Sequence, residues 1–103
     1  MSKSVYVFIR TDIPLADQMV QVGHVCMMVG NKFGCLPDTN LVLLALKNEL
    51  ELLNVECDIS DKKIAYEISW EPDDDMEYTA LATEPLEEEQ KFLFKKFVNW
   101  EAK

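Results

Sequence analysis

A short polar run follows the first apolar stretch of the chain and has the residue types of an anion site. Arg10, Thr11 and Asp12 come directly after the apolar residues 5–9, and a helix is expected to begin near Pro14. In α/β proteins, ligands bind at the carboxyl ends of strands, and a helix N-terminus offers free N–H groups to an anion. Arg10 and this helix start can therefore hold a small anion. In the alternative interpretation the run is structural: Asp12 caps the helix, and Arg10 pairs with Asp12 or with another carboxylate.

His24 is the only histidine, so it is a candidate for acid–base chemistry near neutral pH. Asp17 lies seven residues earlier, which is about 10 Å along a helix axis. A link between the two side chains therefore needs Gln21 as a bridge. In the alternative interpretation His24 is a structural group, because general acid–base catalysis needs a partner within hydrogen-bond reach.

Metal and cofactor chemistry is not indicated by the remaining side chains. Cys26, Cys35 and Cys57 lack the spacing of zinc ligands, and one histidine cannot complete a Cys/His set. The acidic residues 71–77 lack the glycine and the spaced carboxylates of a calcium loop, so we interpret them as a solvated loop. We expect no metal site and no cofactor.

The apolar patterns predict four strands. Residues 5–10 and 41–46 are apolar on both alternating faces, as in strands covered on two sides. Residues 63–70 and 78–83 alternate, as in half-buried strands.

Three helices are predicted between and after these strands. The first opens at Asp12 and Pro14 and closes near Gly30, and the second starts at Asn48, three residues before Glu51. The third begins at Pro85 and carries an apolar stripe. The stripe comprises Leu86, Leu93, Phe97 and Trp100.

The first helix has apolar side chains on two faces. The face expected to meet the sheet comprises Leu15, Met19, Val22, Cys26 and Val29. Val20, Met27 and Met28 lie opposite, and Phe92 of the last helix is expected to extend this patch. An apolar face left over in this way favours a homodimer or a partner contact.

The order β-α-β-α-β-β-α predicts an α/β fold. We expect one domain over residues 1–103, with a four-stranded mixed sheet and helices on both of its faces. The early strands should be parallel, and the last pair antiparallel or split.

The charge balance limits the classes of partner. The 103 residues include 19 acidic and 10 basic side chains, for a formal net charge of −9. Binding to tRNA through many phosphates is therefore disfavoured. No apolar run reaches the ~18 residues of a membrane span, and we expect no signal peptide. The three cysteines suit free thiols in a reducing compartment, so a cytoplasmic location is expected.

The chain resembles the type II peptidyl-tRNA hydrolase family. "VFIRTDI" followed by "QVGHV" is similar to the family's Arg-x-Asp-Leu and Gln-Cys-x-His-Ala motifs, and "YTALATEPL" resembles its Thr-x-Thr-x-Leu-x-x-x-Pro ending. The positions that match in kind are Arg10, Thr11, Asp12, Gln21, His24 and Thr79. The resemblance implies a mixed four-stranded α/β fold, often dimeric, that cleaves the ester between a peptide and tRNA.

The departures from the family pattern indicate a loss of activity. The lysine that the family carries at the helix start is absent, and Asp17 and Gln18 are the nearest residues. The family's Asp-Ala-Gly turn is replaced by the strongly acidic segment "SWEPDDDME", residues 69–77.

We therefore predict a binding module that retains the fold and has lost hydrolysis. Its ligand is a small anion such as a nucleotide, or it binds a protein partner. The ligand-binding candidates are Arg10, Thr11, Asp12, Gln21, His24, Lys32 and Lys47. In the alternative, a divergent peptidyl-tRNA hydrolase, Asp12 or His24 orients a water and Thr79 assists. A third interpretation is a structural subunit without a pocket.

Overall fold

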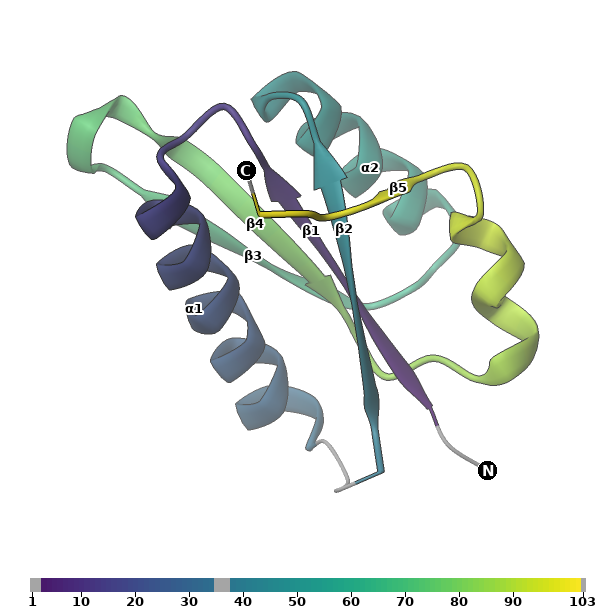
Figure 1. Cartoon of the computed structure of the whole chain (residues 1–103). Coiled ribbons are helices and arrows are strands. Elements are labelled where there is room, and N and C mark those ends of the chain that lie inside the picture. The colour runs from purple at the N-terminus through teal and green to yellow at the C-terminus, as the bar shows by residue number, and fades with distance from the viewer. Residues whose placement is uncertain (1–2, 35–37, 103) are drawn as a thin grey trace.

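One mixed β-sheet carries a helix on each face (Figure 1). This computed structural model describes residues 3–34 and 38–102. The sheet order is β3-β4-β1-β2-β5, with β1 and β2 parallel and the other pairs antiparallel. The elements are β1 (Ser4–Arg10), α1 (Leu15–Phe33), β2 (Asn40–Leu46), α2 (Glu49–Asp61), β3 (Tyr66–Glu71), η1 (Asp73–Asp75), β4 (Glu77–Thr83), η2 (Glu88–Phe94) and β5 (Val98–Asn99). The α/β class is confirmed, and the expected four-stranded sheet has five strands.

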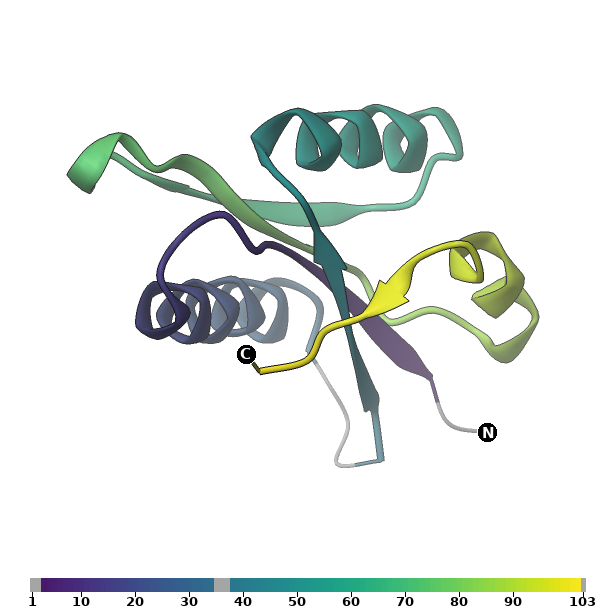
Figure 2. The same ribbon diagram turned by 45° about the horizontal axis from the view of Figure 1, so that its top comes forward.

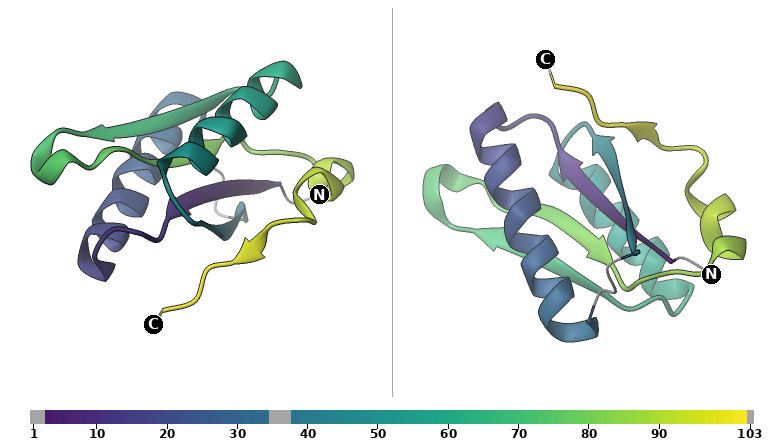
Figure 3. Two further views of the ribbon diagram at one scale, coloured as in Figure 1. Left: turned by 90° about the horizontal axis from the view of Figure 1, so that it is seen from above. Right: turned by 60° about the horizontal axis from the view of Figure 1, so that its bottom comes forward.

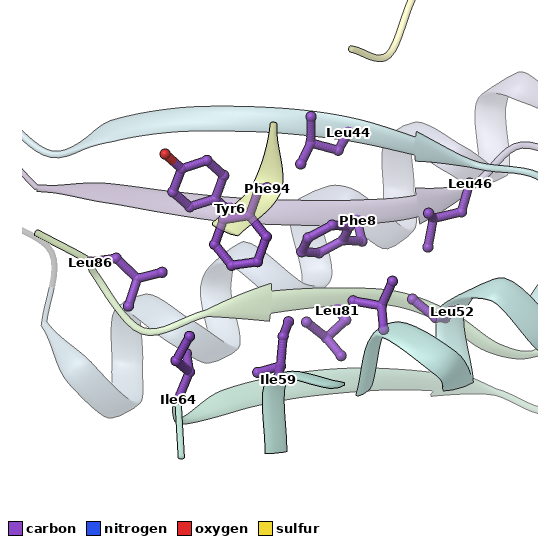
Figure 4. Close-up of a cluster of buried hydrophobic side chains, with 11 residues drawn as sticks. Tyr6, Phe8, Leu44, Leu46, Leu52, Ile59, Ile64, Leu81, Leu86 and Phe94 are labelled. Atoms are coloured by element: carbon purple, nitrogen blue, oxygen red, sulfur yellow. The ribbon is translucent and has the colours of Figure 1, made fainter. Parts of the chain in front are cut away.

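Strand β1 is central and covered on both faces, as its sequence predicts. Val7 and Ile9 belong to the apolar cluster beneath α1, whereas Tyr6 and Phe8 belong to the cluster beneath α2. Figure 4 shows the α2 side, where Phe8 lies among side chains from β2, β4 and α2. A strand apolar on both alternating faces is stable only between two such layers.

The sequence prediction of a third helix after Pro85 is wrong. Only η2 is helical there, as a 3-10 helix, and β5 then pairs with β2. Residues 95–102, which we call the C-terminal segment, run past the β2 edge of the sheet (Figure 2).

The aromatic residues of the chain end explain this departure. Phe94 is buried and Phe97 packs in the cluster beneath α2, but Trp100 packs against the cluster beneath α1. Because one straight helix cannot bury side chains on opposite faces of a sheet, the chain extends around the edge strand. Tertiary burial here overrides the helical spacing of the apolar residues.

The predicted sheet-facing stripe of α1 is correct in part: Val29 is buried, and Val22 and Cys26 pack against the cluster beneath α1. The buried residues of the helix are Gln18, Gln21, Val25 and Val29. Leu15 and Met19, expected on the buried face, are 40% and 64% exposed. No helix within the described ranges is long and apolar enough to cross a membrane.

Helix α1 continues past the predicted end near Gly30 to Phe33, and α2 has the predicted N-cap at Asn48. Gly34, at the C-cap of α1, has a φ of 68°, a left-handed conformation that favours glycine. Asn48 Oδ1 accepts a hydrogen bond from Glu51 N at 3.0 Å, which confirms the cap of α2. Glu51 Oε1 in turn accepts from Lys47 N at 2.7 Å.

Candidate functional site

Arg10 and Asp12 form a bidentate ion pair at the end of β1. Arg10 Nε lies 2.7 Å from Asp12 Oδ1, and Arg10 Nη2 lies 2.9 Å from Asp12 Oδ2. Arg10 Nη1 donates to Met76 O at 2.5 Å and to Tyr78 O at 3.1 Å. The Arg10 side chain is only 13% exposed. Arg10 therefore links the end of β1 to the start of β4. Its ion pair with Asp12 agrees with the structural interpretation of residues 10–12.

The ion pair occupies the groups that an anion would need. The hydrogen bond from Arg10 lowers the pKa of Asp12, and partial burial opposes this effect. The same bond raises the pKa of Arg10. Asp12 does not cap α1, since Pro14 is at the N-cap and no side-chain cap bond forms.

The lowered pKa of Asp12 predicts an acid-sensitive contribution to stability. Because the folded state holds the ionised carboxylate, this contribution is present above the unfolded-state pKa and is lost as the pH falls through the folded-state pKa. Asp12→Asn should lower the free energy of unfolding at pH 7 by about 1 kcal/mol, since the pair is partly screened by solvent.

Urea titrations from pH 7 to pH 2 measure this effect. The difference between wild type and Asp12→Asn should shrink below about pH 4. Asp61→Asn is the matched control, because Asp61 is exposed at the end of α2 and forms no ion pair among the described residues. If the loss of unfolding free energy in Asp12→Asn stays constant with pH, the ion pair between Arg10 and the ionised Asp12 is not its cause.

Gln21 and Thr79 belong to a buried polar cluster between α1 and the β3–β4 hairpin. Gln21 Oε1 accepts hydrogen bonds from Ser69 Oγ at 2.8 Å and from Thr79 Oγ1 at 2.9 Å. Thr79 is 0% exposed and Gln21 is 3% exposed. Gln21 Nε2 donates to Glu71 Oε2 at 3.4 Å. These side chains satisfy one another's hydrogen-bonding groups and link α1 to the β3–β4 hairpin.

The other candidates lie apart from this cluster. His24 is exposed on α1 and makes no hydrogen bond or ion pair within residues 3–34 and 38–102. Lys32, near the other end of α1 from Asp12, pairs with Glu67 at 3.1 Å. The three residues suggested for catalysis, Asp12, His24 and Thr79, therefore contact different partners or none.

The apolar patch expected on α1 is smaller than predicted. Val20 and Met27 are 63% and 75% exposed, as expected, but Met28 packs against the cluster beneath α1. Element η2, which contains Phe92, lies at the end of the sheet away from α1 (Figure 1).

A cleft of about 810 Å³ lies between α2, the end of β2 and the C-terminal segment. We call it the α2 cleft. Thr11 and Lys47, predicted as ligand contacts, line it, and Arg10 does not. It opens at the carboxyl ends of the parallel pair β1 and β2, where α/β folds bind ligands. The lining residues are Thr11, Ala45, Leu46, Lys47, Glu51, Asn54, Val55, Asp58, Lys96, Phe97 and Val98.

The lysines of the α2 cleft are outside the ion pairs of the described residues. Neither Lys47 nor Lys96 forms one, although Lys96 Nζ lies 5.4 Å from the centroid of the Phe97 ring and its charge helps to lower the pKa of Asp58. The cleft carboxylates are engaged: Asp58 pairs with Lys62 at 2.7 Å, and Glu51 accepts from the Lys47 amide. The bond from Lys62 lowers the pKa of Asp58, which stays ionised at neutral pH. The cleft thus offers two ammonium groups beside an apolar floor.

Sequence reasoning missed Lys96 and Phe97 as cleft residues. The apolar spacing predicts a third helix that includes Phe97, and such a helix would not bring the C-terminal segment to β2. The excess of aromatic residues near the chain end was the one available signal.

A scan of the sequence against protein-family models finds no match, and a search of curated proteins finds none either. The geometry of the α2 cleft therefore carries the functional argument.

Proposed function

We propose that this protein binds a small amphipathic anion, such as a nucleotide, in the α2 cleft. The observation that carries the proposal is the presence of two lysines, Lys47 and Lys96, that form no ion pair among the described residues and line one cleft of a chain with net charge −9. The volume of about 810 Å³ is in the range of small-molecule sites.

The lining suits a ligand with a flat or aliphatic body and one anionic group. Leu46, Val55 and Phe97 supply apolar surface for the body. The ammonium groups of Lys47 and Lys96 supply charge-assisted hydrogen bonds to a phosphate or carboxylate. Asn54, exposed on α2, adds a neutral donor and acceptor.

The contacts of Asp12, His24 and Thr79 favour a protein that binds its ligand without hydrolysing it over a divergent hydrolase. The Asp12 carboxylate is held by Arg10, and the Thr79 hydroxyl donates to Gln21. Neither is therefore free to orient a water, and His24 has no partner of the kind that a general base needs among the described residues.

The proposal includes a scaffold similar to type II peptidyl-tRNA hydrolases. The residues that carry the resemblance lie at the end of β1 and on α1, apart from Thr79 on β4. The fifth strand departs from the four-stranded sheet that the resemblance implies.

The test compares anions with neutral analogues of the same shape. The probes are adenosine 5′-monophosphate with adenosine, and 2-naphthoate with 2-naphthamide, titrated into ¹⁵N-labelled protein. We expect each anion to shift the amide signals of Leu46, Lys47 and Asn54 more strongly than its neutral analogue does.

Paired charge reversals provide the matched control. Lys47→Glu with Lys96→Glu should weaken anion binding about tenfold or more, because each lost or reversed contact exceeds about 1 kcal/mol. Lys63→Glu with Lys95→Glu makes the same change in net charge at exposed lysines outside the cleft, and should leave Kd within about twofold.

Two results would contradict the proposal. One is the absence of any cleft shift with all four probes at millimolar concentration. The other is release of an N-acetylated amino acid from its tRNA ester by the wild-type protein, abolished in Asp12→Ala. The second result would establish the divergent hydrolase instead.

A further inference from the structure

Two exposed aromatic side chains stand opposite each other on the β3–β4 hairpin. Trp70 and Tyr78 are cross-strand partners, and they are 55% and 37% exposed. Cross-strand partners project from the same face of a sheet, so the two rings lie on one surface. The hairpin projects past the N-terminal end of α2 in both Figure 2 and Figure 3, which leaves this part of the sheet uncovered by a helix.

Carboxylates lie near this aromatic pair along the hairpin. Glu77 directly precedes Tyr78, Glu71 directly follows Trp70 and is turned toward Gln21 of α1, and Asp73 and Asp75 lie in η1. Glu49 Oε2, at the start of α2, accepts a hydrogen bond from Tyr78 N at 3.0 Å.

These carboxylates form no ion pair within the protein. In the part of the chain that the structure describes, no lysine or arginine forms an ion pair with any of these five side chains. Arg10 is near enough for the charges of Glu49 and Glu77 to help raise its pKa, but its ion pair is with Asp12.

We propose that the Trp70–Tyr78 face docks a basic segment of a partner protein, with a lysine or arginine side chain packed against the two rings. Aromatic faces attract cations, and tryptophan attracts them most strongly. The nearby carboxylates supply the longer-range attraction and set the register of the segment.

Charge selects this occupant over the two other candidates. A second copy on a twofold axis would bring the same acidic surface against itself, and like charges at an interface are unfavourable. A nucleic acid would bring phosphates toward the carboxylates of Glu49 and Glu77. The face shares no residue with the α2 cleft, so this inference does not depend on the proposed anion site.

The hairpin is held in place without a partner. Arg10 Nη1 donates to the carbonyl groups of Met76 and Tyr78, and Glu49 accepts from the Tyr78 amide. A surface anchored in this way needs little ordering when a partner binds, which favours affinity.

The first experiment removes the rings. Binding of a fluorescein-labelled oligoarginine peptide is followed by fluorescence anisotropy, with an oligoglutamate peptide as the negative control. Trp70→Ala combined with Tyr78→Ala should weaken oligoarginine binding about three- to tenfold. Phe92→Ala, which removes an aromatic ring that is 64% exposed on η2, should leave Kd within about twofold.

The second experiment separates this face from diffuse attraction to an acidic protein. Glu49→Gln with Glu77→Gln should weaken binding more than Glu89→Gln with Glu101→Gln, although both pairs change the net charge equally. Gln at position 49 keeps an acceptor for the Tyr78 amide, so the hairpin should remain in place.

Equal weakening by the two glutamate pairs, or no effect of the aromatic variants, would overturn the proposal. It would also fail if sedimentation reveals a dimer of the wild-type protein that Trp70→Ala converts to a monomer, since a second copy would then cover the face. Circular dichroism of every variant confirms that a loss of binding is not a loss of fold.

Discussion

Phe94→Ala is expected to lower the free energy of unfolding by about 3–5 kcal/mol, as large-to-small changes of buried phenylalanine do. Phe94 is 6% exposed, and its ring centroid lies 4.5 Å from that of Tyr6 and 5.6 Å from that of Phe8 (Figure 4). Few atoms can close the cavity, because Tyr6 and Phe8 are fixed on the central strand. Urea unfolding followed by circular dichroism measures the change.

Phe92→Ala is the matched control for this prediction. Phe92 is two residues away in the same 3-10 helix but is 64% exposed, so its removal should change stability by no more than about 0.5 kcal/mol. Similar losses for the two variants would show that Phe94 does not anchor this part of the chain.

The same variant tests the link between packing and the α2 cleft. Phe94 precedes the C-terminal segment, whose Lys96, Phe97 and Val98 form one wall of the cleft. Under native conditions, Phe94→Ala should therefore weaken anion binding and speed amide exchange at Trp100, whose N–H donates to Leu43 O at 3.0 Å. Phe92→Ala should change neither quantity.

The sequence predicts the sheet well where one pattern dominates. Residues 5–10 and 41–46 are apolar throughout and become the parallel strands β1 and β2. The antiparallel pair β3 and β4 follows from alternation and from the short acidic loop between them. In these segments local propensity and tertiary burial favour the same conformation.

The predicted burial of side chains is wrong in two situations. In one, polar residues are buried, and in the other, nearby apolar residues pack on opposite faces of the sheet. Gln18 lies on the buried face of α1 because its Nε2 donates to Ile13 O at 2.8 Å and its Oε1 accepts from Trp100 Nε1 at 2.7 Å. Ile13 lies before the helix begins and Trp100 comes from the far end of the chain, so a helical projection reveals neither partner. Ser69 is 2% exposed because α1 covers it and its hydroxyl donates to Gln21 Oε1, whereas Trp70, the next residue, is 55% exposed.

The candidate site shows the same limit. Arg10 and Asp12 were correctly recognised as partners of each other in one of two interpretations, since an i, i+2 spacing at a strand end is local information. Lys47 was named as a contact, but the segment that completes its cleft comes from the far end of the chain. A site whose walls come from segments far apart in the sequence depends on tertiary contacts, and a local sequence pattern does not contain that information.

Gln21→Met is expected to lower the free energy of unfolding by about 2–4 kcal/mol, although it fills nearly the same volume. The Ser69 and Thr79 hydroxyls, 2% and 0% exposed, would lose the acceptor that they share. A buried donor left without a partner costs about 1–3 kcal/mol. Thr79 keeps a weaker alternative in Ser69 O at 3.4 Å, so most of the loss should come from Ser69.

A rescue variant distinguishes this cause from a packing defect. Replacing all the polar partners together, as Gln21→Met with Ser69→Ala and Thr79→Val, should recover most of the lost stability, because no donor is then left unpaired. If the triple variant is less stable than Gln21→Met, the hydrogen bonds are not the cause. Anion binding to folded Gln21→Met should stay within about twofold of wild type, since Gln21 does not line the α2 cleft. A large loss of affinity in a stable Gln21→Met protein would instead place the ligand at the position that the family resemblance implies.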